Sequence, residues 1–196
     1  MERTLRSNGK NKSIVIVSGL PRSGTSMMMQ MLEAGGVQAV TDGQRVSDDD
    51  NPRGYYELEK VKGIKEDSSW LEEGKAYKIV SALLFYLPPE KSFSVVFMRR
   101  DLREILSSQK AMIERRGSTG AEISDEQLME KFATHLASVE KWLLGRKNVR
   151  FQYIEYGDVV RDPLRQAKLV RRFLGFELDV GSMARAVDHS LHRHHS

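Results

Sequence analysis

A short loop of small residues is the part of this sequence whose residue types and spacing most clearly indicate chemistry. It reads Gly19-Leu-Pro-Arg-Ser-Gly24-Thr25-Ser26. Glycines let backbone N–H groups approach an anion, and a helix that begins here would add the positive end of its dipole. Nucleoside triphosphatases carry Lys where Thr25 stands, because that Lys reaches the β and γ phosphates. Here the long cation is Arg22, inside the loop, which favours a grip on a 5′-phosphate over a grip on a triphosphate.

Two residues further along the chain could hold a second anion. Arg100 follows an apolar run, and Ser108 lies eight positions later. If a helix begins at Asp101, Ser108 lies two turns further on the same face, so Arg100 and Ser108 could converge on one anion. Arg99 and Ser107 have the same spacing one residue earlier. The sequence leaves these two registers open.

The elements that must position these residues are predicted by the pattern of apolar residues. β-Branched and apolar runs predict strands at 13–18, 75–81, 93–98 and 151–154. Helical spacing and end signals predict helices from Thr25 to the Gly35-Gly36 pair, from Asp101 through Met112, from the capping box at Ser124 through Leu143, and over 163–174. This alternation predicts an α/β, three-layer P-loop-type fold with a central parallel β-sheet flanked by helices. Ligands bind at the carboxyl ends of the strands in such folds.

Length and composition limit the function classes. A chain of 196 residues with 40% apolar residues is the size of one domain, so we expect a single domain over 1–196, with a polar N-terminal tail (1–12) and a mobile C-terminal tail (189–196). The sequence contains no cysteine, which removes thiolate catalysis and thiolate zinc sites. A formal net charge of +4 is too small to indicate a nucleic-acid partner. Without a long apolar run or a secretory signal, we expect a cytoplasmic protein that has no membrane partner.

The loop resembles the 5′-phosphosulfate loop of the sulfotransferase family, P-(K/R)-S-G-T-(S/T), which is matched by 21–26. In that family a strand ends in Arg, often followed by Asp or Asn, and a Ser lies eight positions on, as in Arg100-Asp101 and Ser108. The segment 153–163, followed by 172–175, looks like the family's Y-x-D…DP…FLG segment. The order P-R-S-G-T-S, M-M-M and N-P-R-G-Y-Y-E is most similar to uncharacterised bacterial sulfotransferase-like proteins.

The resemblance implies a donor and the residues that bind it. The donor is 3′-phosphoadenosine 5′-phosphosulfate (PAPS), and the product that stays bound is adenosine 3′,5′-bisphosphate. By resemblance, Arg100 and Ser108 contact the 3′-phosphate and Tyr156 contacts the adenine. The 5′-phosphate would be held by the loop residues Arg22, Ser23, Gly24, Thr25 and Ser26. The acceptor would be a hydroxyl or amine on a small molecule, a glycan or a peptide, and no metal is required.

The residues that assist transfer are less completely matched. Animal cytosolic sulfotransferases carry K-T-H after a central strand, with Lys assisting the transferring group and His as the base. Lys78-Ile79-Val80 stands there in this chain, so the Lys is kept and the His is absent. The family's basic R-K-G segment is not apparent either. Arg193 stands near the C-terminus instead, among histidines that we expect to be solvated, namely His189, His192, His194 and His195.

A carboxylate must therefore accept the proton of the acceptor group. We expect Glu57, because Pro52 and Gly54 can turn the chain toward the sheet and partial burial makes a carboxylate a better proton acceptor. Asp42 is the alternative. Adjacent like charges make the run 48–50 more costly to bury.

The long polar segment 41–54 is expected to form part of the acceptor site, because it exceeds the length of a plain connection. Two other functions stay open. A P-loop nucleotide kinase would need magnesium and a lysine in the loop. A non-catalytic nucleotide-binding module of sulfotransferase fold would be consistent with the absent His.

Overall fold

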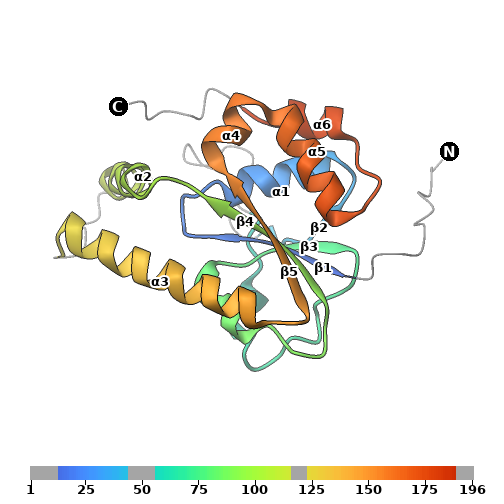
Figure 1. The fold of residues 1–196 in the computed structure, drawn as a ribbon, viewed down its shortest axis with the longest axis horizontal. Coiled ribbons are helices and arrows are strands. Elements are labelled where there is room, and N and C mark those ends of the chain that lie inside the picture. Colours follow the sequence, from blue (N-terminus) through green and yellow to red (C-terminus); the bar gives the residue numbers. More distant parts are fainter. Residues whose placement is uncertain (1–12, 44–55, 116–122, 189–196) are drawn as a thin grey trace.

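Five parallel strands form the centre of the protein. The structure is a computed structural model that describes residues 13–43, 56–115 and 123–188 (Figure 1). The strands lie in the order β2-β3-β1-β4-β5. Their bounds are β1 (Ile14–Gly19), β2 (Gln38–Ala39), β3 (Lys75–Lys78), β4 (Phe93–Arg99) and β5 (Val149–Glu155). Every residue of β1 is buried, as expected for a parallel strand that is covered on both faces.

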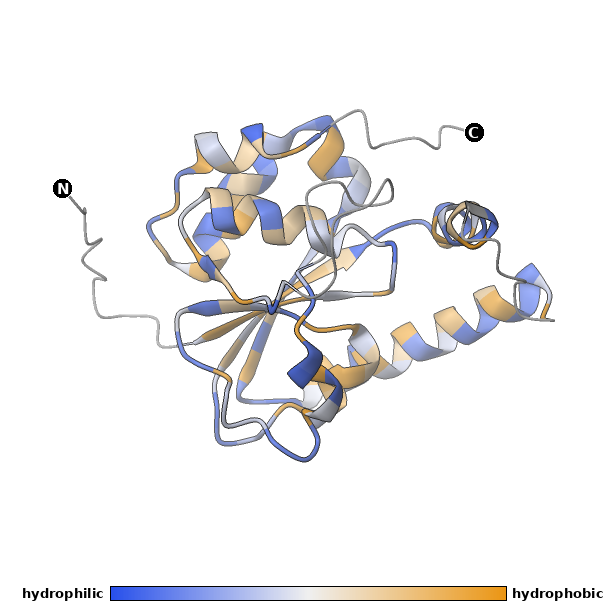
Figure 2. Cartoon of the chain, turned by 180° about the vertical axis from the view of Figure 1, so that it is seen from behind, coloured by the Kyte–Doolittle hydropathy of each residue, from blue (hydrophilic) through white to orange (hydrophobic). Residues whose placement is uncertain are grey.

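Helices cover the two faces of this sheet, which confirms the predicted three-layer α/β fold. One face packs against α1 (Thr25–Ala34), α4 (Tyr156–Arg161), α5 (Pro163–Leu174) and α6 (Val180–Arg185). The other face packs against α3 (Asp125–Gly145) and two 3-10 helices, η1 (Glu59–Gly63) and η2 (Ser81–Tyr86). The helix α2 (Leu102–Arg115) follows β4 directly. Apolar and polar residues alternate along α3 (Figure 2), so one stripe of this helix can pack on the sheet.

Local signals in the sequence explain where two of the helices begin. Ser124 caps α3 through a capping box, in which its hydroxyl accepts from the Gln127 N–H. The Asp162 carboxylate accepts from the Arg165 N–H at the start of α5, and Gly175 ends that helix in a left-handed conformation with φ 70°. Both helices have the predicted bounds to within two residues.

The helix α6 ties the end of α1 to the rest of its layer. The Asp179 N–H donates to the Gly35 carbonyl at 3.1 Å, and a Cβ at Gly35 would lie 2.6 Å from the Met183 side chain. This close approach requires a residue without a side chain at the end of α1. Among the described helices, none combines the length and apolar character needed to cross a membrane.

Candidate active site

The loop between β1 and α1 forms a turn that presents backbone N–H groups at the carboxyl end of the sheet. Three of its residues have positive φ, namely Gly19 (150°), Arg22 (71°) and Gly24 (96°). Gly24 is the N-cap of α1, and no side chain of the described residues caps this helix. A Cβ at Gly24 would lie 2.6 Å from the Tyr156 ring, so the loop can pack on that ring only because residue 24 is glycine. An uncapped helix N-terminus beside a glycine turn can bind an anion.

Arg22 joins this loop to the residues that follow β4. Its Nε donates to the Ser108 hydroxyl at 2.9 Å, and the Arg100 Nη1 donates to the Arg22 carbonyl at 3.2 Å. Ser108 and the Arg100 side chain are both nearly buried, at 4% and 8% exposure. The structure therefore brings Arg22, Arg100 and Ser108 together from three separate points of the sequence.

Two more side chains determine how the Arg100 guanidinium lies. Its Nε donates to the Glu104 carboxylate at 2.8 Å, and its central carbon lies 4.3 Å from the centre of the Tyr156 ring. Burial raises the pKa of Tyr156, while the Arg100 charge acts in the opposite direction. Glu104 is a residue of this site that the sequence patterns did not predict. Its position four residues after Arg100 is a signal that could have done so, since such residues are neighbours on a helix.

A lysine and a carboxylate lie on the other side of the loop, at the end of β3. The Lys78 side chain is 10% exposed, and its Nζ donates to the Ser26 hydroxyl at 3.2 Å. The same Nζ lies 3.7 Å from the Glu57 Oε1. The carboxyl ends of β1 and β3 are neighbours in the sheet, which is why residues so far apart in sequence meet here.

Asp42 lies beside Glu57 but contacts its backbone. The Asp42 N–H donates to the Glu57 carbonyl at 3.2 Å, and the Asp42 carboxylate accepts from the Glu59 N–H at 2.6 Å. The predicted acceptor segment 41–54 is described only over 41–43. The rest of it, including the aspartates 48–50, and the C-terminal histidines in 189–196 lie outside the described residues.

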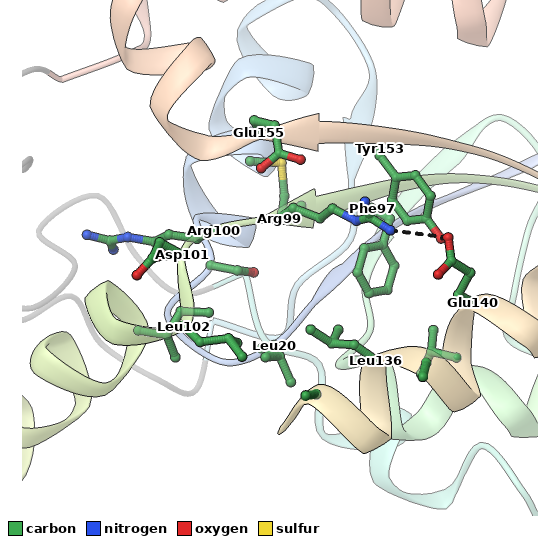
Figure 3. A pocket seen from close by; sticks show the side chains of 16 residues that line it. Leu20, Phe97, Arg99, Arg100, Asp101, Leu102, Leu136, Glu140, Tyr153 and Glu155 are labelled. Carbon is green, nitrogen blue, oxygen red and sulfur yellow. Dashed lines mark hydrogen bonds and ion pairs between the residues drawn. The ribbon is translucent and has the colours of Figure 1, made fainter. Parts of the chain in front are cut away.

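Arg99, the alternative to Arg100, makes different contacts. A cavity of about 570 Å³ lies between α2, α3 and the ends of β4 and β5 and is lined by both arginines, and the Arg99 side chain extends across it (Figure 3). Its guanidinium stacks 3.5 Å from the centre of the Tyr153 ring and lies 3.4 Å from a Glu140 oxygen. Burial raises the pKa of Tyr153. Ser107 is exposed, so within the described chain Arg100 and Ser108 meet the loop residue Arg22, and Arg99 stacks in the cavity.

The described part of the chain offers no group of three His, Cys, Asp or Glu side chains that could hold a metal ion. Thr25, in the position of the triphosphatase lysine, begins α1. The site therefore consists of a helix N-terminus, two arginines, a serine and a lysine with its carboxylate neighbour. Such an arrangement can hold a ligand with two anionic groups and leave a cation and a carboxylate beside one of them.

Comparisons with known proteins agree with this fold. The family model described as sulfotransferase domain matches residues 12–195. The structure of the sulfotransferase STF1 from Mycobacterium tuberculosis superposes with a TM-score of 0.59 and 16% identity, over 90% of this chain and 71% of that one. Retinol dehydratase, solved with androsterone and the inactive cofactor PAP, superposes with a TM-score of 0.51 and 17% identity, over 88% of this chain and 62% of that one. This chain thus spans less than two thirds of the retinol dehydratase chain, and no curated protein matched its sequence.

Proposed function

The chain belongs to the sulfotransferase domain family, and from this premise we propose that it transfers the sulfuryl group of PAPS to a hydroxyl or amine of an acceptor. The observation that carries the proposal is the convergence of Arg100 and Ser108 on Arg22, next to the uncapped N-terminus of α1. Two anion-binding groups on either side of one loop fit a nucleotide that carries phosphates at both its 3′ and 5′ positions. The similar retinol dehydratase was solved with PAP, the abbreviation for adenosine 3′,5′-bisphosphate. This supports a 3′,5′-bisphosphate as the ligand of the present chain.

The donor would be held along the carboxyl ends of β1 and β4. Backbone N–H groups of Ser23, Gly24, Thr25 and Ser26, together with the α1 dipole, would hold the 5′-phosphate. Arg100 and Ser108, which both contact Arg22, would hold the 3′-phosphate side of the nucleotide, and Arg22 would reach the 5′-phosphate. The buried Tyr156 ring would face the adenine. This assignment leaves the Lys78 side of the loop for transfer.

Transfer would occur beside Lys78. The acceptor oxygen or nitrogen forms a bond to sulfur while the bond from sulfur to the 5′-phosphate oxygen breaks, and that phosphate keeps the electron pair. Lys78 and Arg22 would stabilise the charge on the transferring and departing groups, because positioned cations are most effective where charge develops. Glu57, 3.7 Å from Lys78, would take the proton of the acceptor group. Asp42 is the alternative proton acceptor.

The acceptor class to test first is a small molecule, since the similar retinol dehydratase was solved with androsterone. Glycans and peptides are the further classes. The competing kinase function is disfavoured by Thr25 in place of the loop lysine. A non-catalytic nucleotide-binding protein would share the donor site and differ only in the outcome of a transfer assay.

A thermal shift measurement with adenosine 3′,5′-bisphosphate and with ATP tests the donor site. A ligand that binds only the folded protein raises its apparent stability, so the bisphosphate should raise Tm more than ATP does. Radiolabelled PAPS and a panel of hydroxyl and amine acceptors, with magnesium chelated, then test transfer. Absence of a shift at saturating bisphosphate would rule out the donor assignment. A shift without transfer to any acceptor would favour the non-catalytic function.

A further inference from the structure

Asp42 and its neighbour Thr41 hold the backbone around Glu57 through three hydrogen bonds, which we call the Asp42 clamp. The Thr41 hydroxyl and the Asp42 N–H both donate to the Glu57 carbonyl, at 3.0 Å and 3.2 Å. The Asp42 carboxylate accepts from the Glu59 N–H, at 2.6 Å, where η1 begins. Asp42 therefore binds the chain on both sides of residue 58.

The contact between Glu57 and Lys78 needs such support. The Glu57 side chain is 44% exposed and its oxygen lies 3.7 Å from the Lys78 Nζ, a separation at which an exposed ion pair contributes little to its own geometry. Tyr56, just before Glu57, has a φ of 52°, a conformation that a residue with a side chain adopts only where its surroundings hold it. The Tyr56 hydroxyl donates to the Glu33 carboxylate on α1. The backbone at 56–59 is thus held from two directions.

The two carboxylates are held by different kinds of contact. The Asp42 oxygen accepts from the Glu59 backbone N–H at 2.6 Å, where η1 begins. A Glu57 oxygen lies 3.7 Å from the Lys78 Nζ.

We propose that Asp42 is a positioning residue that holds Glu57 against Lys78 and takes no proton itself. The proposal rests on the function proposed above, in which Glu57 accepts the proton of the acceptor group. It assigns the two carboxylates different tasks, although both are acidic residues at the same end of the sheet. A small displacement of a catalytic group can lower turnover by about 100-fold, so a clamp of this kind can have a large effect on rate.

Four variants separate positioning from proton transfer. Asp42→Ala should lower kcat about 10- to 100-fold, with bisphosphate affinity changed by less than about twofold. Asp42→Asn should keep turnover within about threefold of wild type, because the amide oxygen still accepts from the Glu59 N–H. Glu57→Gln should lower kcat strongly, and adding Asp42→Ala to it should cause no further loss, since Asp42 acts only through Glu57.

Asp67→Ala is the matched control for Asp42→Ala. Asp67 is also an exposed aspartate that accepts a backbone N–H, from Ser69 at 2.8 Å, and it lies in a different loop from the Lys78 and Glu57 pair. This variant should leave kcat unchanged. If it lowers kcat as much as Asp42→Ala does, the effect of Asp42 is a general loss of structure and the proposal is wrong.

A second readout does not depend on activity. A zero-length carbodiimide cross-link should join Lys78 to Glu57 in the wild type and in Asp42→Asn, and mass spectrometry should find it lost in Asp42→Ala. The Lys75 and Glu72 pair, 2.7 Å apart, serves as the internal standard in every sample. Retention of the Lys78 cross-link in Asp42→Ala would overturn the proposal.

The two proposals fail in different ways. If Asp42→Asn abolishes turnover while the cross-link and bisphosphate binding persist, Asp42 is the proton acceptor and the positioning role is wrong. If the wild type forms the cross-link and Asp42→Ala loses it, but no sulfuryl group is transferred from PAPS, the clamp is supported and the proposed enzymatic function is wrong.

Discussion

The Arg100 guanidinium lies 4.3 Å from the centre of the Tyr156 ring and donates to the Arg22 carbonyl of the loop. One side chain thus connects the end of β4, the start of α4 and the turn before α1. Stacking on the Tyr156 ring and hydrogen bonding to Arg22 together fix the orientation of the planar Arg100 guanidinium. The ammonium group of a lysine is not planar and could not be oriented in this way. This relationship makes Arg100 the residue on which the proposed 3′-phosphate contact most depends.

Replacing Arg100 by Ala should weaken adenosine 3′,5′-bisphosphate far more than adenosine 5′-monophosphate. Loss of charge-assisted hydrogen bonds should cost about 1.5–3 kcal/mol of binding free energy for the bisphosphate, or about 10- to 100-fold in Kd by calorimetry. Arg99→Ala is the control, because Arg99 stacks on Tyr153 in the cavity (Figure 3). Equal weakening of both nucleotides by Arg100→Ala would show that Arg100 does not contact the 3′-phosphate.

Gly24→Ala should abolish bisphosphate binding and destabilise the fold. Its φ of 96° strains any side chain, and a Cβ there would collide with the Tyr156 ring at 2.6 Å. Gly74→Ala is the matched control, since Gly74 has a φ of 76° but no atom within 4 Å of the added Cβ. Each variant should lose about 1–2 kcal/mol of unfolding free energy from backbone strain, and only Gly24→Ala should lose more than this and lose the ligand. Denaturant unfolding measures the loss of unfolding free energy in each variant. Similar losses in Gly24→Ala and Gly74→Ala would mean that the Tyr156 contact is unimportant.

Lys78→Met should lower turnover about 100-fold or more while donor affinity changes little, because its cation would act mainly on charge that develops during transfer. The side chain of methionine retains the apolar length of the lysine. Lys75→Met, on the same strand, removes a lysine paired with Glu72 and should leave kcat unchanged. Kinetics with labelled PAPS would contradict the role of Lys78 if the two variants behaved alike.

Acid should destabilise the protein partly through His135. Burial lowers the pKa of His135 below its ordinary value of 6.5, and its Nε2 lies 2.8 Å from the Ser81 hydroxyl. The unfolded chain therefore takes up the proton more readily than the folded protein does. The stability that the neutral ring contributes is complete above about pH 6.5 and is lost as pH falls through the lowered pKa.

His135→Gln should consequently show a smaller drop in Tm than the wild type between about pH 7.5 and about pH 5. The histidines of 189–196 are present in both proteins, so their contribution cancels in the comparison. Parallel curves for the two proteins would mean that His135 titrates normally in the folded state.

Local signals in the sequence predicted some elements well and others not at all. The helix α5 was predicted over its observed bounds because both of its ends have local signals. Pro163 favours the start of a helix, and Gly175 ends it in a left-handed conformation. The helix α4 was missed, because this segment of six residues carries Gly157 and two valines and has no helical period of its own. The strand β2 has two residues, which is too short to give an alternating pattern.

The candidate site likewise contains residues that local spacing indicated and contacts that only the fold reveals. Spacing along one helix pointed to Arg100 and Ser108, and their common contact with Arg22 makes this register the one that meets the loop. Arg99 is the last residue of β4 and Arg100 follows it, so only their contacts in the fold show that Arg100 meets the loop and that Arg99 stacks on Tyr153. The Asp42 clamp connects Thr41 and Asp42 to the backbone of Glu57 and Glu59, and no spacing of residue types in the sequence indicates such a pairing.

The packing of Tyr156 on Gly24, and of α6 on the end of α1, has a consequence for biosynthesis. The ribosome makes the loop and α1 before it makes the ring and the helix that hold them in place. A nascent chain that carries the whole loop therefore lacks two of its supports until α6 has left the exit tunnel. Nascent chains that end before α6 should bind no nucleotide, and the donor should protect only chains that contain both Tyr156 and α6 from proteolysis.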